Sequence, residues 1–460
     1  MPALPSNRIA ALDALRGIAI LGMVLSGILP RAILPAWMYH AQVAPPQHVF
    51  DPTLPGITWV DLVFPFFLFS MGAAFPLAMR PGLEAGKSLG KMSFRILKRG
   101  GLLVIFAIML QHLRPHHIQN PPNAMTWGLA IVGFMVLILV YSEYPLQWMQ
   151  ERKWVRWLGW ALLLVWIPIY QLISPNDFSL GRSDIILLVL ANMAIVAALL
   201  WLFSTERPEL RVGVLLLYLA LRLAHDHSEW MSSIWSWSPV DWFFRWDYLK
   251  YLFIVIPGTF AGELLLQAKQ ERSTERAGPV IFVSVLILVI TLVGLIGFQQ
   301  RWLLASSVIL GFGTIFSALS SRLLTFAHGK LLTWGAFLVL LGVFLEPFEG
   351  GIKKDPSTLS YYALTAGLAF YSILLFRLWE DRISQFWLWK LVVDNGRNPM
   401  LAYVLMGNLI WPVLTLTGVE TLIGRLHGQA IPLVLVAFVK MLVLALLVQF
   451  ITNRGWRWRT

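Results

Sequence analysis

The 460-residue chain contains no cysteine. This absence excludes disulfide bonds, thiolate metal sites and a cysteine nucleophile. Charged residues are also scarce, at 13% of the chain, whereas soluble globular proteins carry about 25%. The shortage of charge excludes a chain of ordinary soluble domains.

Hydrophobic residues make up 58% of the chain instead. They form continuous runs, whereas a transmembrane β-barrel alternates apolar and polar residues. A run of roughly 20 apolar residues crosses about 30 Å of hydrocarbon as a helix. We therefore predict an all-α, polytopic transmembrane helix bundle that forms a single integral membrane domain over residues 1–460.

Apolar segments long enough to be considered as spans number about fourteen. The count falls to twelve if the short segment 211–224 and the small, polar segment 302–320 do not cross. Lys and Arg gather in alternate loops, which places both termini in the cytoplasm. One predicted cytoplasmic loop alone contains Arg80, Lys87, Lys91, Arg95, Lys98 and Arg99. The net charge of +12 then reflects orientation in the membrane, and we expect no nucleic-acid partner.

This topology places nearly all histidines on the extracytoplasmic side. They are His40, His48, His112, His116, His117, His225, His227 and His427, and only His328 falls inside. Histidine exchanges protons near neutral pH, so the grouping favours acid–base chemistry or polar-substrate binding on that side. The alternative is that they are polar loop residues near lipid headgroups. The clusters at 112–117 and 225–227 lack a metal-ligand spacing, and we expect no metal.

A tryptophan-rich stretch, HDHSEWMSSIWSWSPVDWFFRWD, occupies residues 225–247. Two interpretations remain open. Tryptophans form aromatic belts at membrane interfaces, and indole faces also pack against the apolar faces of sugar rings.

Charged residues within apolar segments are costly and indicate function. Asp13 and Arg16 are three residues apart and share a helical face. They form an internal ion pair, or Arg16 meets an anionic ligand together with nearby Arg8. Asp61 falls in the first turn of its helix, where a carboxylate favours the helix dipole. It caps the helix, orients a neighbouring histidine, or does both.

Three later segments carry further polar residues at predicted helix entrances. Asp247 and Lys250 precede one apolar run, and Lys353, Lys354 and Ser357 precede another, both from outside. The segment DNGRNPMLAY enters from inside, where Asn395 or Asn398 is predicted to cap a helix that has Pro399 in its first turn.

Two motifs resemble those of a known family. The segment LDALRGIAILGMVL is followed by a His-Ala loop and by GITWVDLVFPFFLFSMG, and this order resembles the heparan-α-glucosaminide N-acetyltransferase family of membrane acyltransferases. The later segments KKDPSTLSYYALTAGLA and GRNPMLAYVL are similar to that family's later signatures. The N-terminal pattern is also similar to bacterial membrane sugar O-acetyltransferases.

The resemblance implies a helix bundle that takes acetyl-CoA from the cytosol and acetylates a sugar or glycan hydroxyl or amine on the other side. His40-Ala41 matches the family's His-Ala pair, so His40 is the expected general base and Asp61 its orienting carboxylate. His48 is the rival base, because this chain has extra residues between His40 and Asp61. Ser26-Gly27 stands where the family has an asparagine.

The expected donor contacts lie on the cytoplasmic side and are Arg8, Asp13, Arg16, Arg95, Arg99 and Asn398. The expected acceptor contacts lie outside and are Asp247, Lys250, Lys353, Lys354 and Ser357. The planar guanidinium suits the phosphates of acetyl-CoA. We expect location in the lipid bilayer of a bacterial inner membrane, and we leave homodimer formation open.

Another class of protein fits part of the same pattern. A transporter or flippase for a polar or lipid-linked solute would also have charged residues that face the bundle interior, kinked helices and tryptophans around the entrance of its pathway. It predicts broken helices near the midplane and a repeat that relates two halves. No repeat is visible in the sequence. A catalytically inactive sensor with the acyltransferase fold is a third interpretation.

Overall fold

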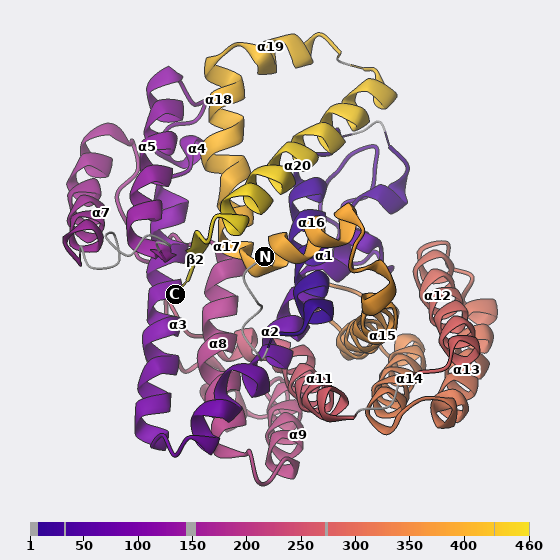
Figure 1. The fold of residues 1–460 in the computed structure, drawn as a ribbon. Helices are drawn as coiled ribbons and strands as arrows, with labels where there is room; N and C mark the ends of the chain where they lie inside the picture. Colours follow the sequence, from indigo (N-terminus) through magenta and orange to yellow (C-terminus); the bar gives the residue numbers. More distant parts are fainter. Residues whose placement is uncertain (1–7, 32–33, 144–152, 272–274, 427, 460) are drawn as a thin grey trace. The chain divides into compact units, whose positions relative to one another are not determined.

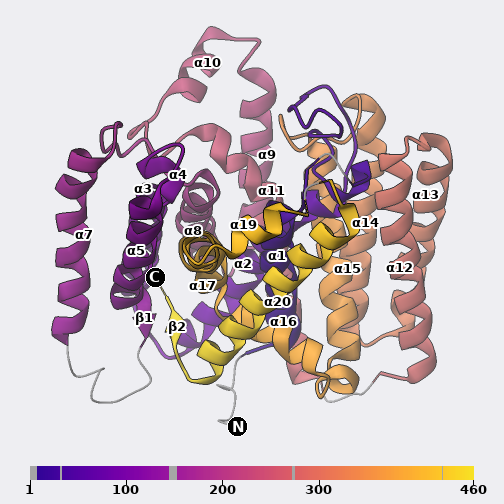
Figure 2. The same ribbon diagram turned by 90° about the horizontal axis from the view of Figure 1, so that it is seen from above.

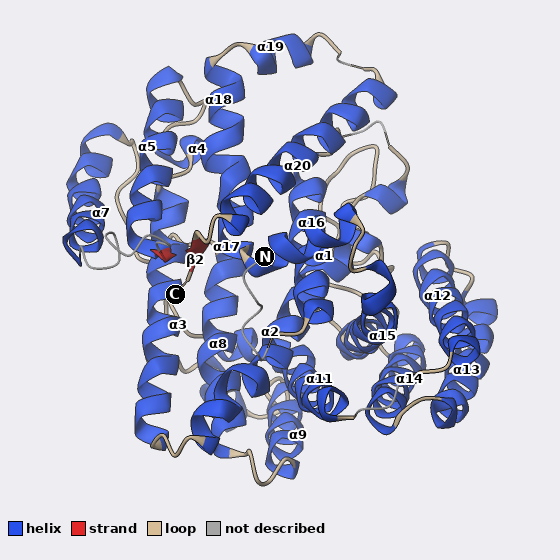
Figure 3. Cartoon of the chain, in the orientation of Figure 1, coloured by secondary structure: helices blue, strands red, loops and turns tan. Residues whose placement is uncertain are grey.

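The computed structural model describes residues 8–31, 34–143, 153–271, 275–426 and 428–459. Nearly every described segment is helical (Figure 3). The strands of this part of the chain are the two-residue β1 (Ser142–Glu143) and β2 (Arg457–Trp458), which pair antiparallel. The predicted all-α class is confirmed. Among the outer histidines, His427 falls outside the described residues.

Twelve helices of the described residues are long and apolar enough to cross a membrane. The segment that the sequence left in doubt at 302–320 is one of these twelve candidates. The segment 211–224 is not, because its helix, α9 (Glu209–Ala224), has only 16 residues. Of the fourteen segments considered in the sequence, the other one outside the twelve is α3 (Leu89–His112), whose first half carries Lys91, Arg95, Lys98 and Arg99.

The residues group into two compact units, each assembled from segments that are distant in sequence. Unit 1 comprises Met1–Met92, Leu200–Leu215 and Tyr251–Val393. Unit 2 comprises Ser93–Leu199, Leu216–Lys250 and Asp394–Thr460.

The elements of unit 1 are α1 (Ala10–Ile28), η1 (Ala36–Met38), α2 (Trp59–Glu84), α11 (Leu252–Gln270), α12 (Ala277–Gln299), α13 (Leu303–Ser320), η3 (Ser321–Leu323), α14 (Phe326–Phe348) and α15 (Leu359–Ile383). The elements of unit 2 are α4 (Pro115–Ile118), α5 (Ala124–Tyr141), β1, α7 (Lys153–Ile173), α10 (Glu229–Ser236), α17 (Pro399–Leu405), the π-helix η4 (Met406–Ile410), α18 (Trp411–Leu416), α19 (Val419–Gly424), α20 (Ala430–Asn453) and β2. Five elements contain the boundaries, namely α3, α8 (Ile185–Phe203), α9, η2 (Trp246–Tyr251) and α16 (Trp387–Arg397).

Close helix contacts hold unit 1 together. Gly258 and Gly262 of α11 lie against the backbone of α2, where an added Cβ would overlap the carbonyl oxygens of Phe69 and Ala73. Small residues at such crossings let two backbones approach within the bilayer, where lipid tails remove the hydrophobic drive for helix association. Helices α12, α13, α14 and α15 lie side by side (Figures 1 and 2).

The helices of unit 1 have two distinct ends. At the first, the loop 29–58 meets the connection 349–358, since the Gly56 N–H donates to the Ile352 carbonyl at 2.8 Å. Figure 2 shows this indigo loop beside the orange connection between α14 and α15. We name it the His40 end. The second, the Arg16 end, contains the start of α1 and the connections from α11 to α12 and from α13 to α14.

Unit 2 also has two ends. At one, β2 pairs with β1, and the side chain of Asn398 accepts a hydrogen bond from the Trp458 N–H at 3.0 Å. At the other lie the end of α3, the short helix α4 and the loop 174–184, because the Asp184 N–H donates to the Ala107 carbonyl at 3.0 Å. We name these the hairpin end and the α4 end.

Candidate functional site

The loop 29–58 places His40 beside the start of α2. Tyr39 fixes this part of the loop, because its hydroxyl donates to the Pro30 carbonyl at 2.5 Å and accepts from the Leu34 N–H at 3.2 Å. The Thr58 hydroxyl then donates to the Tyr39 carbonyl at 2.8 Å. These bonds join both sides of the loop at the position where His40 follows Tyr39.

Asp61 is anchored at the first turn of α2 with only 1% of its side chain exposed. Its Oδ2 accepts from the Thr58 N–H at 3.0 Å, the Thr58 hydroxyl at 3.1 Å and the Ala41 N–H at 3.1 Å. This arrangement includes a capping box, so the predicted capping role is confirmed. Because Oδ2 is occupied by three donors, Oδ1 is the oxygen that faces other groups.

His40 lies against that oxygen. Its Nε2 is 3.3 Å from Asp61 Oδ1, and its Nδ1 accepts from the Gln42 N–H at 3.0 Å. These partners assign the proton of the neutral ring to Nε2 and the lone pair to Nδ1. The imidazole is 21% exposed, which leaves it accessible at the His40 end.

The electrostatics keep this imidazole neutral. Burial lowers the pKa of His40, Asp61 and Asp355 act to raise it, and Lys354 acts to lower it, with a lowered pKa as the net result. A histidine whose pKa lies below its ordinary value is unprotonated at neutral pH and can accept a proton.

The connection 349–358, which is distant in the sequence, completes the site. The Lys354 ammonium lies 3.8 Å from Asp61 Oδ1, on the same oxygen that faces His40. Buried Gln42 joins the two segments, since its side chain donates to the Asp355 carbonyl at 2.5 Å and accepts from the Asp355 N–H at 2.9 Å. Lys354 was predicted as an acceptor contact, whereas Gln42 was missed.

Two further residues hold this connection, and the sequence analysis missed Glu349. The Tyr361 hydroxyl donates to the Asp61 carbonyl at 2.8 Å. The Glu349 carboxylate accepts from the Leu359 and Ser360 N–H groups, both at 2.7 Å, and so caps α15. The geometry of the His40 end is therefore fixed from both α2 and α15.

The other predicted residues of this end have different surroundings. His48, in the left-handed region with a φ of 49°, packs edge-on against the Tyr39 ring, with centroids 4.5 Å apart. Lys353 is half-buried, and Ser357 is buried and forms a β-bridge with Lys354. The structure thus pairs His40, and not His48, with Asp61.

At the Arg16 end, the predicted ion pair is present. Arg16 Nη1 lies 3.4 Å from Asp13 Oδ1, and Arg8 Nε lies 3.8 Å from Asp13 Oδ2. Arg16 also donates to the Ser70 carbonyl at 3.4 Å. Two guanidinium groups share one buried carboxylate, which leaves a net positive charge among the three.

The remaining predicted contacts belong to unit 2. Arg95 and Arg99 are exposed on α3, one helical turn apart. Lys250 binds Asp247 at 2.8 Å. Asn398 stands before Pro399 at the start of α17, but its side chain makes no cap. Its amide instead donates to the Thr452 hydroxyl and the Trp456 carbonyl, so the predicted capping role was wrong.

A charge cluster around the buried Arg211, near the Arg16 end, was not predicted. Arg211 is fully buried, with Nη2 2.8 Å from Glu263 Oε1 and Nη1 donating to the Thr259 hydroxyl at 2.9 Å. The Trp201 indole N–H also donates to Glu263 Oε1, at 2.9 Å. Arg211 escaped notice because it lies in the first turn of a helix too short to be a clear span.

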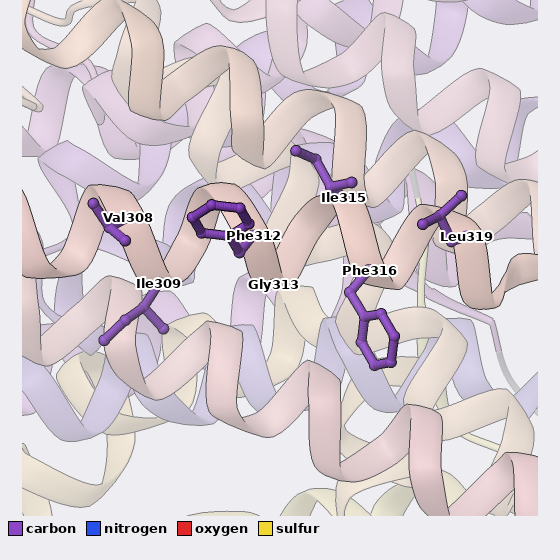
Figure 4. Close-up of a pocket in the computed structure, with 7 residues that line it drawn as sticks. All are labelled: Val308, Ile309, Phe312, Gly313, Ile315, Phe316 and Leu319. Carbon is purple, nitrogen blue, oxygen red and sulfur yellow. The ribbon is translucent and has the colours of Figure 1, made fainter.

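An apolar groove lies elsewhere in unit 1, along α13 (Figure 4). It is lined by Val308, Ile309, Phe312, Gly313, Ile315, Phe316 and Leu319. These side chains carry no titratable or nucleophilic group, and Phe312 is 73% exposed. The groove suits contact with lipid tails and offers no catalytic chemistry.

The fold defines the class of this protein: an integral membrane protein built as an all-α helix bundle. Residues 8–265, more than half of the chain, match the family described as "Domain of unknown function (DUF5009)". The chain therefore belongs to that family. No curated protein matches the chain. The matched range includes Arg16, His40 and Asp61, whereas Lys354 lies beyond it.

Proposed function

We propose that this protein is a membrane acetyltransferase that uses His40 as its general base. The observation that carries the proposal is the paired geometry of His40, with Nε2 at Asp61 Oδ1 and the lone pair of Nδ1 directed to a single backbone N–H. An acceptor hydroxyl or amine that replaces the Gln42 N–H at Nδ1 can give its proton to the ring. Asp61 then stabilises the imidazolium through Nε2.

The reaction is the transfer of an acetyl group from acetyl-CoA to a sugar. The acceptor oxygen or nitrogen forms a bond to the acetyl carbonyl carbon as His40 takes its proton. The carbon–sulfur bond breaks, and the leaving thiolate takes the proton from His40. A positioned base of this kind contributes roughly 10²–10⁴-fold to the rate. A covalent acetyl-histidine is an alternative form of the same chemistry.

The donor is proposed to bind from the Arg16 end. Arg8 and Arg16 lie together at Asp13, and planar guanidinium groups suit the phosphates of acetyl-CoA. From Arg16 to Ile28 the helix α1 rises about 18 Å, at about 1.5 Å per residue. Acetyl-CoA carries its thioester on a long arm, which suits a donor that is held at one end and reacts at the other.

Orientation follows from the charges of the loops. We propose that the His40 end faces away from the cytoplasm, in a bacterial inner membrane, because the basic loops lie at the opposite end. The acceptor sugar would then arrive from outside, where Lys353, Lys354 and Ser357 line the connection beside His40. Labelling of Ala44→Cys and Ala85→Cys with an impermeant maleimide in intact spheroplasts tests this, and only Ala44→Cys should react.

The proposed activity can be tested in proteoliposomes that contain the purified protein. Acetyl-CoA is placed on one side, and a panel of amino sugars and neutral sugars on the other. We expect an acetylated sugar, detected by mass spectrometry, only when donor and acceptor face opposite sides. Absence of product for every sugar, from protein that is folded and does not bind CoA in a calorimetric titration, would contradict the proposal.

The second candidate function, transport of a polar solute, is favoured by one observation. Fully buried Arg211 forms an ion pair with Glu263, whose side chain is 24% exposed, and charged residues within a membrane-spanning bundle mark ion or substrate pathways. Uptake of labelled sugar by the same proteoliposomes, without acetylation, would support transport instead.

A further inference from the structure

The α4 end of unit 2 gathers basic side chains from two connections. Arg114, at the start of α4, places Nη2 2.7 Å from Asp184 Oδ2 and donates through Nη1 to the Gln111 side chain at 3.1 Å. Its side chain remains 34% exposed. The guanidinium is thus held in one orientation and still open to solvent on part of its surface.

Arg182 approaches from the loop between α7 and α8. Its Nη1 donates to the Tyr170 hydroxyl at 2.9 Å, and that hydroxyl donates to the His117 carbonyl at 2.8 Å. Tyr170 therefore fixes Arg182 relative to α4. His116, exposed on the same short helix, lies edge-on to Trp127 with ring centroids 5.5 Å apart. We name Arg114, His116, His117 and Arg182 the Arg114 cluster.

The cluster is electropositive. Burial lowers the pKa of His117, and positive charge on Arg114, Arg182, His116 and His112 lowers it further. The buried acid at this end, Asp184, is already engaged, since Oδ2 binds Arg114 and the Tyr403 hydroxyl while Oδ1 accepts from the Leu187 N–H. The cluster thus contains two permanent cations and two titratable imidazoles, and the buried carboxylate of Asp184 is already bound by Arg114.

A rigid frame supports this end. The Asn408 amide, which is buried in the π-helix η4, donates to the Leu113 carbonyl at 2.9 Å, next to Arg114. Tyr403 of α17 binds Asp184 at 2.8 Å. A π-helical turn inside an α-helix often occurs at a functional site. Here it places an amide where it holds the chain that presents the cluster.

The placement of the cluster argues against a role in orientation. The hairpin end of unit 2 carries exposed Arg95 and Arg99 together with the basic C-terminal segment 454–459, so the positive-inside rule assigns that end to the cytoplasm. Arg114 and Arg182 lie at the other end, where arginine is disfavoured by the same rule. Orientation in the membrane therefore does not explain these two arginines, which hydrogen bonds hold in place.

We propose that the Arg114 cluster is an oxyanion-binding site for phosphate on the extracytoplasmic side. Guanidinium groups bind phosphate oxygens through paired N–H donors, and imidazoles add further donors. The phosphate is either the headgroup of an anionic lipid or a soluble phosphate. This site belongs to unit 2 and does not depend on the acetyl transfer proposed for His40.

The test uses the full chain in nanodiscs of phosphatidylcholine. Inorganic pyrophosphate is titrated calorimetrically into wild type, Arg182→Gln and His117→Gln. We expect saturable binding to wild type and a loss of affinity of about 10-fold in either variant, as is typical for a hydrogen bond to a charged group. Arg245→Gln is the matched control, because it removes the same charge from an exposed residue of unit 2 outside the cluster.

A second arm distinguishes the two sources of phosphate. Nanodiscs that also contain phosphatidylglycerol should raise the thermal midpoint of wild type, but not that of Arg182→Gln, if a lipid headgroup occupies the site. If Arg182→Gln fails to fold, the same comparison of thermal midpoints is made with His117→Gln. The proposal is overturned if wild type neither binds pyrophosphate nor gains thermal stability from phosphatidylglycerol. It is also overturned if Arg245→Gln loses as much pyrophosphate affinity as the cluster variants.

Discussion

Unit 1 contains two imidazole–carboxylate pairs, one at each end, and they are built differently. At the His40 end, His40 Nε2 lies 3.3 Å from Asp61, whose other oxygen is held by three donors. At the Arg16 end, His328 Nδ1 lies 2.7 Å from Glu275 Oε1. That same oxygen also accepts from the Thr325 N–H and hydroxyl.

The difference lies in what each carboxylate holds. Glu275 uses the same oxygen, Oε1, for His328 and for Thr325, and so joins the connection before α12 to the start of α14. The side chain of His328 is only 11% exposed. Asp61 uses one oxygen to secure the loop and leaves the other for His40, which is twice as exposed. Proximity of histidine and carboxylate therefore does not by itself make a site. A reactive pair also needs an anchored carboxylate and an accessible ring nitrogen.

The largest expected effect separates the two carboxylates by activity. Asp61→Asn removes the charge that stabilises the His40 imidazolium and should lower the rate of acetyl transfer by roughly 10²–10⁴-fold. Glu275→Gln should leave the rate close to that of wild type. Initial rates are measured at equal amounts of folded protein. A lower rate in Glu275→Gln than in Asp61→Asn would contradict this assignment of the two carboxylates.

Thermal stability, in contrast to the rate, should depend more on Glu275 than on His40. Glu275→Ala removes an acceptor for the Thr325 N–H at the start of α14, and loss of a helix cap typically costs about 1 kcal/mol. His40→Ala, which removes a partly exposed ring, should change the thermal midpoint less. Thermal unfolding in detergent measures both, and equal midpoints for wild type and Glu275→Ala would remove the structural role.

The stability of the Glu275 pair should also depend on pH. Burial acts to raise the pKa of Glu275, but hydrogen bonds from His328 and Thr325 outweigh it, so the pKa is lowered. A carboxyl with a lowered folded pKa stabilises the protein above its ordinary value, and this contribution is lost as the pH falls through the folded pKa. As the pH falls below about 4.3, the ordinary pKa of glutamate, the thermal midpoint of Glu275→Gln should therefore fall less than that of wild type.

A smaller effect concerns the pH profile of the His40 pair. Lys354 acts to lower the pKa of His40, so Lys354→Met should raise that pKa and move the acidic limb of the rate profile to higher pH, by about one unit at most. Lys353→Met, one residue away, is the control and should leave the limb in place. A limb that moves equally in both variants would point to general surface charge.

His48→Ala should have the smallest effect on activity. Its ring packs on Tyr39, which fixes the loop, so a modest loss of rate through loop mobility is expected. Near-complete loss in His48→Ala, with His40→Ala still active, would exchange the roles of the two histidines.

Much of the fold was predictable from local patterns. Continuous apolar runs predicted the helix bundle, the i,i+3 spacing predicted the ion pair of Asp13 and Arg16, and the position of Asp61 predicted its capping role. Each depends on residues that are close in sequence. The helix α3 shows the limit of prediction from local patterns. Basic residues in its first half offset an apolar second half, so the pattern does not clearly identify it as a membrane span.

The rest of the site depends on contacts over long sequence distances. Gln42 meets Asp355, and Tyr361 meets Asp61, only because α2 and α15 enter the bundle at the same end. Nothing near Gln42 in the sequence indicates a buried amide that joins two loops. The choice between His40 and His48 likewise required the path of the loop, since both precede Asp61 within one connection.

The most direct test of this account is the rate of acetyl transfer in His40→Ala and His328→Ala, measured side by side in proteoliposomes that have an active wild-type reference. We predict that His40→Ala falls to background with CoA binding intact, while His328→Ala keeps a rate close to wild type at a temperature below its unfolding. A wild-type rate in His40→Ala, or equal losses in both variants, would contradict the assignment of the reactive pair to the His40 end.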